Sequence, residues 1–278
     1  MGRFDGRVVL ITGAARGQGR SHAVTLARQG ADIAICDIAA PMEWAPYEPA
    51  TPEDLEETAR LVRAEGRRVH SAQLDVADSR QVDDFVASTI AELGQIDGLC
   101  ANAAIYSLSD IVDMDDVQWR RTIDVNLTGV FNSIRAVLPH MIERRSGRIV
   151  AISSVGGRAG FTGAAHYVTT KWGVIGLVKC AAAEAAPYGI TANAICPTSV
   201  PTPMILNERN FQQLVPGIEH PTLDDALPTL EALNPMPGPW VEVEDVSNAL
   251  AFLLSDEARF ISGETLGVAA GWSAGNAA

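Results

Sequence analysis

The 278-residue sequence lacks a basic surplus and a long apolar run. Its formal net charge is −13, whereas binding to nucleic acids or anionic membranes requires an excess of basic residues. No apolar run approaches the roughly eighteen residues that a membrane-spanning helix needs. The amino terminus, MGRFDGRVVLITG, has no apolar stretch followed by a cleavage site. We therefore expect a cytoplasmic protein that acts on small molecules, with neither nucleic acid nor membrane as partner.

Cysteine is scarce and forms no C-x-x-C pair. The four cysteines lie far apart in apolar stretches, at Cys36, Cys100, Cys180 and Cys196. This distribution predicts reduced core thiols rather than disulfides or a metal site. His22 and His166 also have no ligand partners at metal-binding spacing, so we expect no metal, and His166 should line a pocket edge or pack on its helix.

Short apolar segments alternate with longer amphipathic ones along the whole chain. The apolar segments predict strands at residues 8–11, 31–36, 68–74, 96–101, 148–153 and 190–195. Helical spacing occurs over 17–29, 53–65 and 79–93, and each of these stretches ends near a glycine. Strands that are apolar on both faces and separated by helices predict an α/β fold with a doubly wound parallel sheet. We expect one Rossmann-type domain spanning residues 1–278.

A glycine-rich loop follows the first predicted strand. The segment VVLITGAARGQGR places Gly13, Gly17 and Gly19 where that strand turns into a helix. Glycines there let the backbone approach a pyrophosphate, which the helix amino terminus also attracts. At the end of the second strand, Asp37 would bind both ribose hydroxyls and repel a 2′-phosphate, which favours NAD over NADP. Arg16 could pair with a 2′-phosphate or with any pyrophosphate, so NADP remains an alternative.

Three further candidate cofactor-binding residues follow predicted strands, at the edge where open α/β sheets bind ligands. They are Asp75, Val76 and Asn102. Asp75 could accept a hydrogen bond from the adenine amino group. It could equally cap the following helix, since DVADSR precedes that helix and any of its acids could serve.

Four side chains suggest proton-transfer chemistry. Tyr167 and Lys171 are four residues apart on a predicted helix, so both project from one face. The ammonium should favour the phenolate and lower the phenol pKa from about 10, and an oxidised nicotinamide would add a second positive charge. Tyr167 could then act as a general base. Ser154 would hydrogen-bond the substrate oxygen. Asn126 lies in a predicted helix although asparagine is only a middling helix former, which indicates a polar role facing inward.

The segments TGAARGQG and ANAA, together with these four residues, resemble the short-chain dehydrogenase/reductase pattern in order and spacing over almost the whole chain. The resemblance implies catalytic roles for Asn126, Ser154, Tyr167 and Lys171. Lys171 would also hold the nicotinamide ribose, Asn126 would support a water-linked proton path, and Thr202 would bind the nicotinamide carboxamide. The cofactor-binding residues that we expect are Gly13, Arg16, Gly17, Gln18, Gly19, Asp37, Asp75, Val76, Asn102, Ala103, Tyr167, Lys171, Pro197, Thr198, Val200 and Thr202.

The sequence departs from the wider family at two positions. Ala104 and Thr198 stand where that family usually has glycine. The family likeness also implies a homotetramer, with contacts through helix 117–138 and the helix of Tyr167.

A narrower likeness lies in the segments ARGQGRSHAV and CPTSVPTPMILN and in an insert at about residues 38–53. These features resemble the mycofactocin-coupled subfamily, which includes carveol dehydrogenase-like enzymes. The resemblance implies a nicotinamide cofactor that does not exchange readily and is recycled in place by mycofactocin, a separate redox carrier. The insert carries several prolines with Trp44 and Tyr47 and should lie over the adenosine half of NAD as a clasp. A surface or subunit-contact loop is the alternative.

The segment 197–240 combines nine prolines with many apolar residues. The apolar residues include Met204, Ile205, Leu206, Phe211, Leu214, Val215, Ile218 and Met236. Such a segment suits a lid over a hydrophobic substrate, with ordinary packing or an oligomer contact as the alternative.

The sequence thus predicts an oxidoreductase that transfers a hydride between NAD and a hydrophobic secondary alcohol of terpenoid, alicyclic or steroid-like character. An NADP-dependent carbonyl reductase and a non-catalytic dinucleotide-sensing protein remain alternatives.

Overall fold

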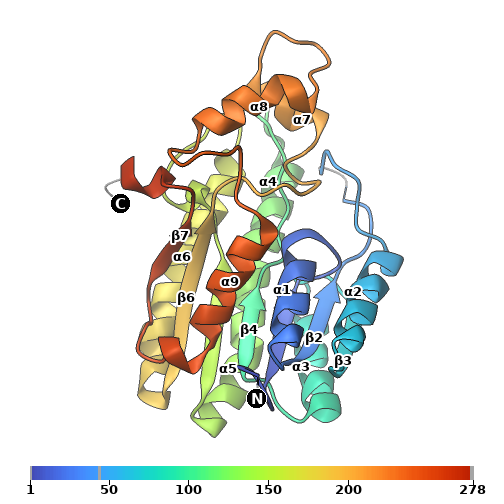
Figure 1. Ribbon diagram of the computed structural model, residues 1–278, viewed down its shortest axis with the longest axis vertical. Helices are drawn as coiled ribbons and strands as arrows, with labels where there is room; N and C mark the ends of the chain where they lie inside the picture. Colours follow the sequence, from blue (N-terminus) through green and yellow to red (C-terminus); the bar gives the residue numbers. More distant parts are fainter. Residues whose placement is uncertain (1, 43–44, 276–278) are drawn as a thin grey trace.

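A computed structural model describes residues 2–42 and 45–275. Glu43 and Trp44 of the expected insert, and residues 1 and 276–278 of the expected domain, lie outside this described part. Seven parallel strands form one sheet in the order β3-β2-β1-β4-β5-β6-β7, with helices on both faces (Figure 1). The predicted α/β fold with a Rossmann-type, doubly wound sheet is therefore confirmed.

The strands form where short apolar segments can be buried on both faces of the sheet. β1 and β6 are buried along their whole length, as expected for central parallel strands. All six strands predicted from apolar runs are present, and a seventh lies near the carboxyl terminus. Their bounds are β1 (Val8–Thr12), β2 (Asp32–Asp37), β3 (Val69–Gln73), β4 (Gly98–Ala101), β5 (Gly147–Ile152), β6 (Ile190–Pro197) and β7 (Thr265–Val268).

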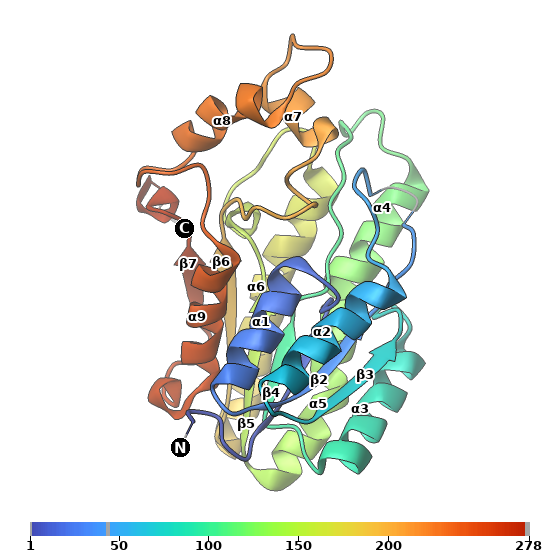
Figure 2. The same ribbon diagram turned by 45° about the vertical axis from the view of Figure 1, so that its right-hand side comes forward.

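Two groups of helices bury the two faces of the sheet (Figures 1 and 2). One face carries α1 (Gly17–Arg28), α2 (Pro52–Ala64) and α9 (Val243–Leu254). The other face carries α3 (Ser79–Leu93), α4 (Asp116–Ile123), α5 (Gly129–Arg144) and α6 (Ala165–Ala185). Each face has its own apolar core, so the sheet is covered by helices on both sides.

The helix expected over 117–138 is longer and less regular than predicted. It runs as α4, a π-helical segment at Asp124–Thr128 and α5, with right-handed backbone angles at both junctions. Asn126 lies in the π segment and is fully buried. Such π turns often occur at functional sites, because the extra residue reorients a side chain without ending the helix.

The segment after β6 forms a helical cap at the carboxyl ends of the strands. Figures 1 and 2 both show α7 (Glu208–Leu214) and α8 (Leu223–Ala232) above the sheet. Phe211, Ala226 and Leu230 are buried against one another in a small core of their own. Several apolar residues of the expected lid therefore pack within the cap, whereas Ile218 and Met236 are exposed.

The expectation of four core thiols holds for three of them. Cys36, Cys100 and Cys196 are buried, but Cys180 is exposed, because it lies on the side of α6 that faces away from the core. All four are free. Among the described helices, none is long and apolar enough to cross a membrane. Within 2–42 and 45–275, no cluster of three or more His, Cys, Asp or Glu side chains could hold a metal ion.

Candidate active site

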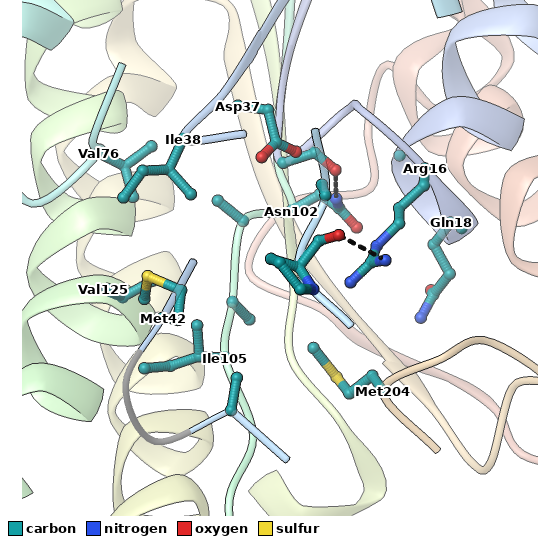
Figure 3. A pocket seen from close by; sticks show the side chains of 18 of the residues that line it. Arg16, Gln18, Asp37, Ile38, Met42, Val76, Asn102, Ile105, Val125 and Met204 are labelled. Carbon is teal, nitrogen blue, oxygen red and sulfur yellow. Dashed lines mark hydrogen bonds between the residues drawn. The ribbon is translucent and has the colours of Figure 1, made fainter. Parts of the chain in front are cut away.

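A cleft of about 1170 Å³, including the space at its mouth, opens at the carboxyl ends of the strands. Figure 3 shows Asp37 at one end of the cleft and Met204 at the other, with Arg16 and Gln18 on one side and Val125 and Ile105 on the opposite side. Most of the predicted cofactor residues line it. They are Gly13, Arg16, Gly17, Gln18, Gly19, Asp37, Asp75, Val76, Asn102, Ala103, Tyr167, Lys171 and Thr202.

Three predicted cofactor residues do not line this cleft. Val200 is only 2% exposed and belongs to the core, and Pro197 is the buried last residue of β6. The Thr198 hydroxyl lies 3.1 Å from Oδ1 of Asn234, to which it donates a hydrogen bond. The cofactor roles of these three residues stay predictions.

The glycine-rich loop is packed too tightly for side chains. Gly13 has a positive φ of 66°, and a Cβ there would lie 2.6 Å from the Ala103 Cα. A Cβ on Gly19 would lie 2.1 Å from the Gly13 carbonyl oxygen. The Asn102 amide donates hydrogen bonds of 3.0 and 2.9 Å to the carbonyls of Thr12 and Gly13. The loop is thus held by β4 with its backbone facing the cleft.

Asp37 anchors the backbone of the glycine-rich loop and of the turn that follows β2. One carboxylate oxygen accepts a 3.0 Å hydrogen bond from the Ala15 N–H, and the other accepts a 2.9 Å bond from Ala39. Ala39 has a φ of 44°, a left-handed conformation that is uncommon for a residue other than glycine. The carboxylate therefore stabilises the turn at which the insert leaves β2.

Arg16 binds the insert. Its guanidinium donates a 3.2 Å hydrogen bond to the Pro49 carbonyl, the dashed line at Arg16 in Figure 3. It donates a second bond to the Glu48 carbonyl. It also lies over the Tyr47 ring, 5.9 Å from the centroid. The Tyr47 hydroxyl in turn accepts a 3.3 Å bond from the Tyr106 N–H. Sequence reasoning considered only phosphate partners for Arg16 and missed this contact, because its acceptors are backbone carbonyls.

Asp75 forms an ion pair that the sequence analysis did not predict. Its carboxylate lies 2.7 Å from the Arg121 guanidinium and also accepts a 2.9 Å bond from the Ala77 N–H. The capping alternative for Asp75 is wrong, because Asp78 is the N-cap of α3. Arg121 lines the cleft and contacts the Met42 sulfur of the insert at 3.8 Å. No local pattern in the sequence relates Arg121 to Asp75, which is 46 residues away.

The expected inward role of Asn126 is confirmed. Its side chain accepts a 2.7 Å hydrogen bond from the Ile105 N–H and donates a 2.8 Å bond to the Ile105 carbonyl. The amide therefore fixes the chain that follows β4. Because Ile105 lines the cleft, Asn126 positions one wall from behind.

Tyr167 and Lys171 enter the cleft together, as predicted from their spacing. The Lys171 Nζ lies 5.4 Å from the centroid of the Tyr167 ring and donates a 2.9 Å hydrogen bond to the Ile152 carbonyl. Ser154 follows β5, and its hydroxyl accepts a 3.0 Å bond from the Gly156 N–H. The three side chains come from two neighbouring elements, α6 and the end of β5.

The pKa of Tyr167 moves in the opposite direction to the one expected from Lys171. Burial of the phenol raises its pKa, and a hydrogen bond with Ser154 offsets only part of that rise. Burial also lowers the pKa of Lys171 to about 8. The protein alone therefore does not favour a phenolate, because desolvation of the phenol is the largest influence on its pKa.

The cleft fits a dinucleotide. The glycine loop and the amino terminus of α1 form a cradle that side chains would fill. For example, a Cβ added to Gly17 would lie 3.1 Å from the Thr202 side chain. The Gln18 side-chain oxygen is buried without a hydrogen-bond partner among the described residues and lines the same cleft, so it could accept a bond from a ligand hydroxyl. Asp37 ends β2, the position from which an acidic residue of a Rossmann-type fold hydrogen-bonds the ribose hydroxyls.

Comparisons with known proteins agree with this geometry. The pattern of the family described as short chain dehydrogenase matches residues 7–213. The (-)-trans-carveol dehydrogenase of Rhodococcus erythropolis is 41% identical over 273 residues, covering 98% of this chain and 99% of the relative. The trans-4-hydroxycyclohexanecarboxylate dehydrogenase of Sinomonas cyclohexanicum is 35% identical over 275 residues, covering 99% and 95%.

Among solved structures, the crystal structure of carveol dehydrogenase from Mycobacterium avium in complex with NAD matches with a TM-score of 0.96 and 44% identity, covering 98% of this chain and 99% of that one. The glycine loop, the Tyr167–Lys171 pair and these similarities lead to one conclusion: the chain belongs to the short-chain dehydrogenase/reductase family, and its predicted likeness to carveol dehydrogenases is confirmed.

Proposed function

We propose that this NAD-dependent alcohol dehydrogenase/reductase oxidises alicyclic secondary alcohols, with Tyr167 as the general base. The main support for this proposal is that Tyr167 and Lys171 line the same cleft as the glycine loop and Asp37. A dinucleotide held by that loop would therefore have its reactive end near the tyrosine. The position of Asp37, with its negative charge in the cleft, supports NAD rather than NADP.

Each of the four catalytic candidates has a separate task in this proposal. Tyr167 takes the hydroxyl proton of the alcohol, and Ser154 holds the alcohol oxygen against it. Asn126 keeps the wall at Ile105 in place. When bound, NAD supplies the hydride acceptor and a positive charge that favours the phenolate. That charge is needed, since burial raises the pKa of Tyr167 and the hydrogen bond with Ser154 offsets only part of the rise.

The insert supports a further proposal, that the nucleotide is held tightly and reoxidised in place by mycofactocin. Seven residues of the insert line the cleft that Asp37 and Asp75 also line: Ile38, Ala40, Met42, Ala45, Tyr47, Pro49 and Ala50. The insert is also tied down at three places: by Arg16 to carbonyls, by Tyr106 to the Tyr47 hydroxyl and by Arg121 to Met42. A segment bound on both sides of the cleft would have to detach before a dinucleotide could leave.

The substrate class is supported by two observations. Met204 and Pro203, at the base of the helical cap, line the cleft, so the expected lid contributes an apolar wall. The names of the relatives refer to carveol and to a hydroxycyclohexanecarboxylate, both of which are secondary alcohols on a six-membered carbon ring. These observations favour an alicyclic alcohol over a linear one.

We also propose that the enzyme is a homotetramer. Three large aromatic residues on α4, α5 and α6 are exposed to solvent. Their exposed fractions are 39% for Trp119, 44% for Phe131 and 46% for Trp172. Burying them against a second copy would remove apolar surface from water. Light scattering on the purified protein and on a Phe131→Glu variant tests this. A monomeric mass for the unaltered protein contradicts the proposal.

One experiment tests the cofactor and its retention together. The purified protein is dialysed and then denatured, and the released nucleotide is identified by mass. We expect NAD. Alicyclic secondary alcohols are then added to undenatured protein, and reduction of the bound nucleotide is followed by its absorbance. Recovery of NADP would contradict the cofactor assignment. Easy loss of NAD on dialysis, with rapid turnover on free NAD, would contradict only the proposed retention.

A further inference from the structure

The Tyr167 ring is flanked on one side by another aromatic ring. Tyr106 meets it edge to face, with ring centroids 4.8 Å apart and an interplanar angle of 79°. Tyr106 directly follows Ile105, whose backbone is held at both its N–H and its carbonyl by Asn126. The Tyr106 ring is therefore attached to a fixed stretch of chain, and edge-to-face packing is the arrangement that aromatic pairs prefer.

Phe161, in the loop before α6, lies near Tyr167 and Ser154. A Cβ added to Gly156 would lie 3.3 Å from Phe161 Cε2, 3.5 Å from the Ser154 hydroxyl oxygen and 3.5 Å from Tyr167 Cε1. The Phe161 ring, the Ser154 hydroxyl and the Tyr167 ring thus all lie next to Gly156. Phe161 is 40% exposed, so part of its ring remains open to a ligand.

The Phe161 ring is supported from behind by the carboxyl-terminal segment. Its centroid lies 6.4 Å from that of Trp272, at an interplanar angle of 61°. The segment before Trp272 is joined to the end of the helical cap, because the Met236 N–H donates a 2.9 Å hydrogen bond to the Ala270 carbonyl. Trp272 thus links the cap to the wall formed by Phe161.

We propose that Phe161, backed by Trp272, and Tyr106 form the two walls of an aromatic slot that selects ring-shaped secondary alcohols. The inference rests on the proposed function and names the residues that set its specificity. Flat aromatic walls contact the two broad sides of an alicyclic ring, whose carbinol carbon then faces Ser154 and Tyr167. A rigid ring also loses less conformational entropy on binding than a linear chain. Both the contacts with the walls and this smaller entropy loss therefore favour the ring.

The test compares cyclohexanol with 2-hexanol, an acyclic alcohol of equal carbon number, by reduction of the enzyme's nucleotide in a single turnover that needs no cofactor exchange. Phe161→Ala should lower the apparent second-order rate constant for cyclohexanol by about tenfold or more, with a smaller loss for 2-hexanol. Trp272→Ala should act in the same direction but less. Phe260→Ala, which removes a ring that is 88% exposed, should change neither rate.

One further variant keeps the proposal falsifiable if Phe161→Ala folds poorly. Phe161→Leu retains apolar bulk and should lie between the unaltered enzyme and the alanine variant. Equal losses for both alcohols in the Phe161 variants would overturn the slot. If the unaltered enzyme reduced its nucleotide with neither alcohol, the proposed function itself would fail.

Discussion

The Lys171 ammonium lies 5.4 Å from the centroid of the Tyr167 ring, yet burial still raises the pKa of that phenol. Lys171 instead directs a hydrogen bond to the Ile152 carbonyl. The proposed mechanism therefore needs an additional positive charge to favour the phenolate of Tyr167. This relationship makes the role of Tyr167 open to a direct test.

Replacing Tyr167 by Phe removes the proton acceptor and keeps the ring. We expect alcohol oxidation to slow by about 100-fold to 10,000-fold, the usual contribution of a general base, while the nucleotide stays bound. Single-turnover reduction of the nucleotide measures the rate, and mass analysis of the denatured variant checks occupancy. Unchanged oxidation would defeat the mechanism. Absence of oxidation in the unaltered protein as well would favour a dinucleotide-sensing role.

Replacing Asp37 by Ala should raise the preference for NADP over NAD by about tenfold or more, because the charge that repels a 2′-phosphate is lost. The ratio of NADP to NAD bound after incubation of the nucleotide-depleted protein with an equal mixture of the two, determined by mass, gives the result. Asp37→Asn is the matched control for charge, since it keeps the size and one acceptor, and it should show the same direction. Both variants should also unfold at lower temperature, because the bonds from Ala15 and Ala39 are weakened. An unaltered cofactor ratio would contradict the assignment of Asp37.

Replacing Arg16 by Ala should speed the release of reduced nucleotide by about tenfold to 100-fold, as expected when hydrogen bonds from a charged group are removed. Displacement of the nucleotide by excess NAD, followed by fluorescence, measures the rate. Arg16→Lys separates two roles: it keeps the charge that would pair with a pyrophosphate but cannot bridge the Glu48 and Pro49 carbonyls. We expect it to resemble Arg16→Ala. A lysine variant that behaves like the unaltered enzyme would contradict the role of Arg16 in closing the insert.

His22 should make the protein less stable in mild acid. It is fully buried between α1 and α9, bonds the Ser247 hydroxyl at 2.7 Å, and has its pKa lowered by burial from 6.5 to about 3. Between these two values the unfolded chain binds a proton that the folded chain does not. The free energy of unfolding should therefore fall as pH decreases through this range, with a slope of up to about 1.4 kcal/mol per pH unit from this residue.

The measurement is urea unfolding at several pH values for the unaltered protein and for His22→Asn, whose pH dependence should be shallower. His220→Asn is the matched control, since His220 is exposed and pairs with Glu208 at the surface. Identical slopes for the unaltered protein and His22→Asn would show that His22 does not contribute.

Much of the fold could be predicted because its signals are local. Apolar runs identified the six strands, and helical spacing placed Tyr167 and Lys171 on one face of α6. The loop from Gly13 to Gly19 was also recognisable, since a tight turn between strand and helix requires glycine at fixed positions. These features depend on residues only a few positions apart, whose relative placement is set by the repeat of a strand or a helix.

The remaining features depend on residues that are distant in the sequence. Arg16 was expected to meet a phosphate, but its donors reach backbone carbonyls of the insert, which have no side-chain signature. The contact of Phe161 with Trp272 joins two segments that no local pattern relates. Local patterns were thus enough to predict the strands, the glycine loop and the spacing of Tyr167 and Lys171. The contacts between remote groups and the direction of the Tyr167 pKa shift follow from the folded chain, because desolvation depends on every atom packed around the hydroxyl.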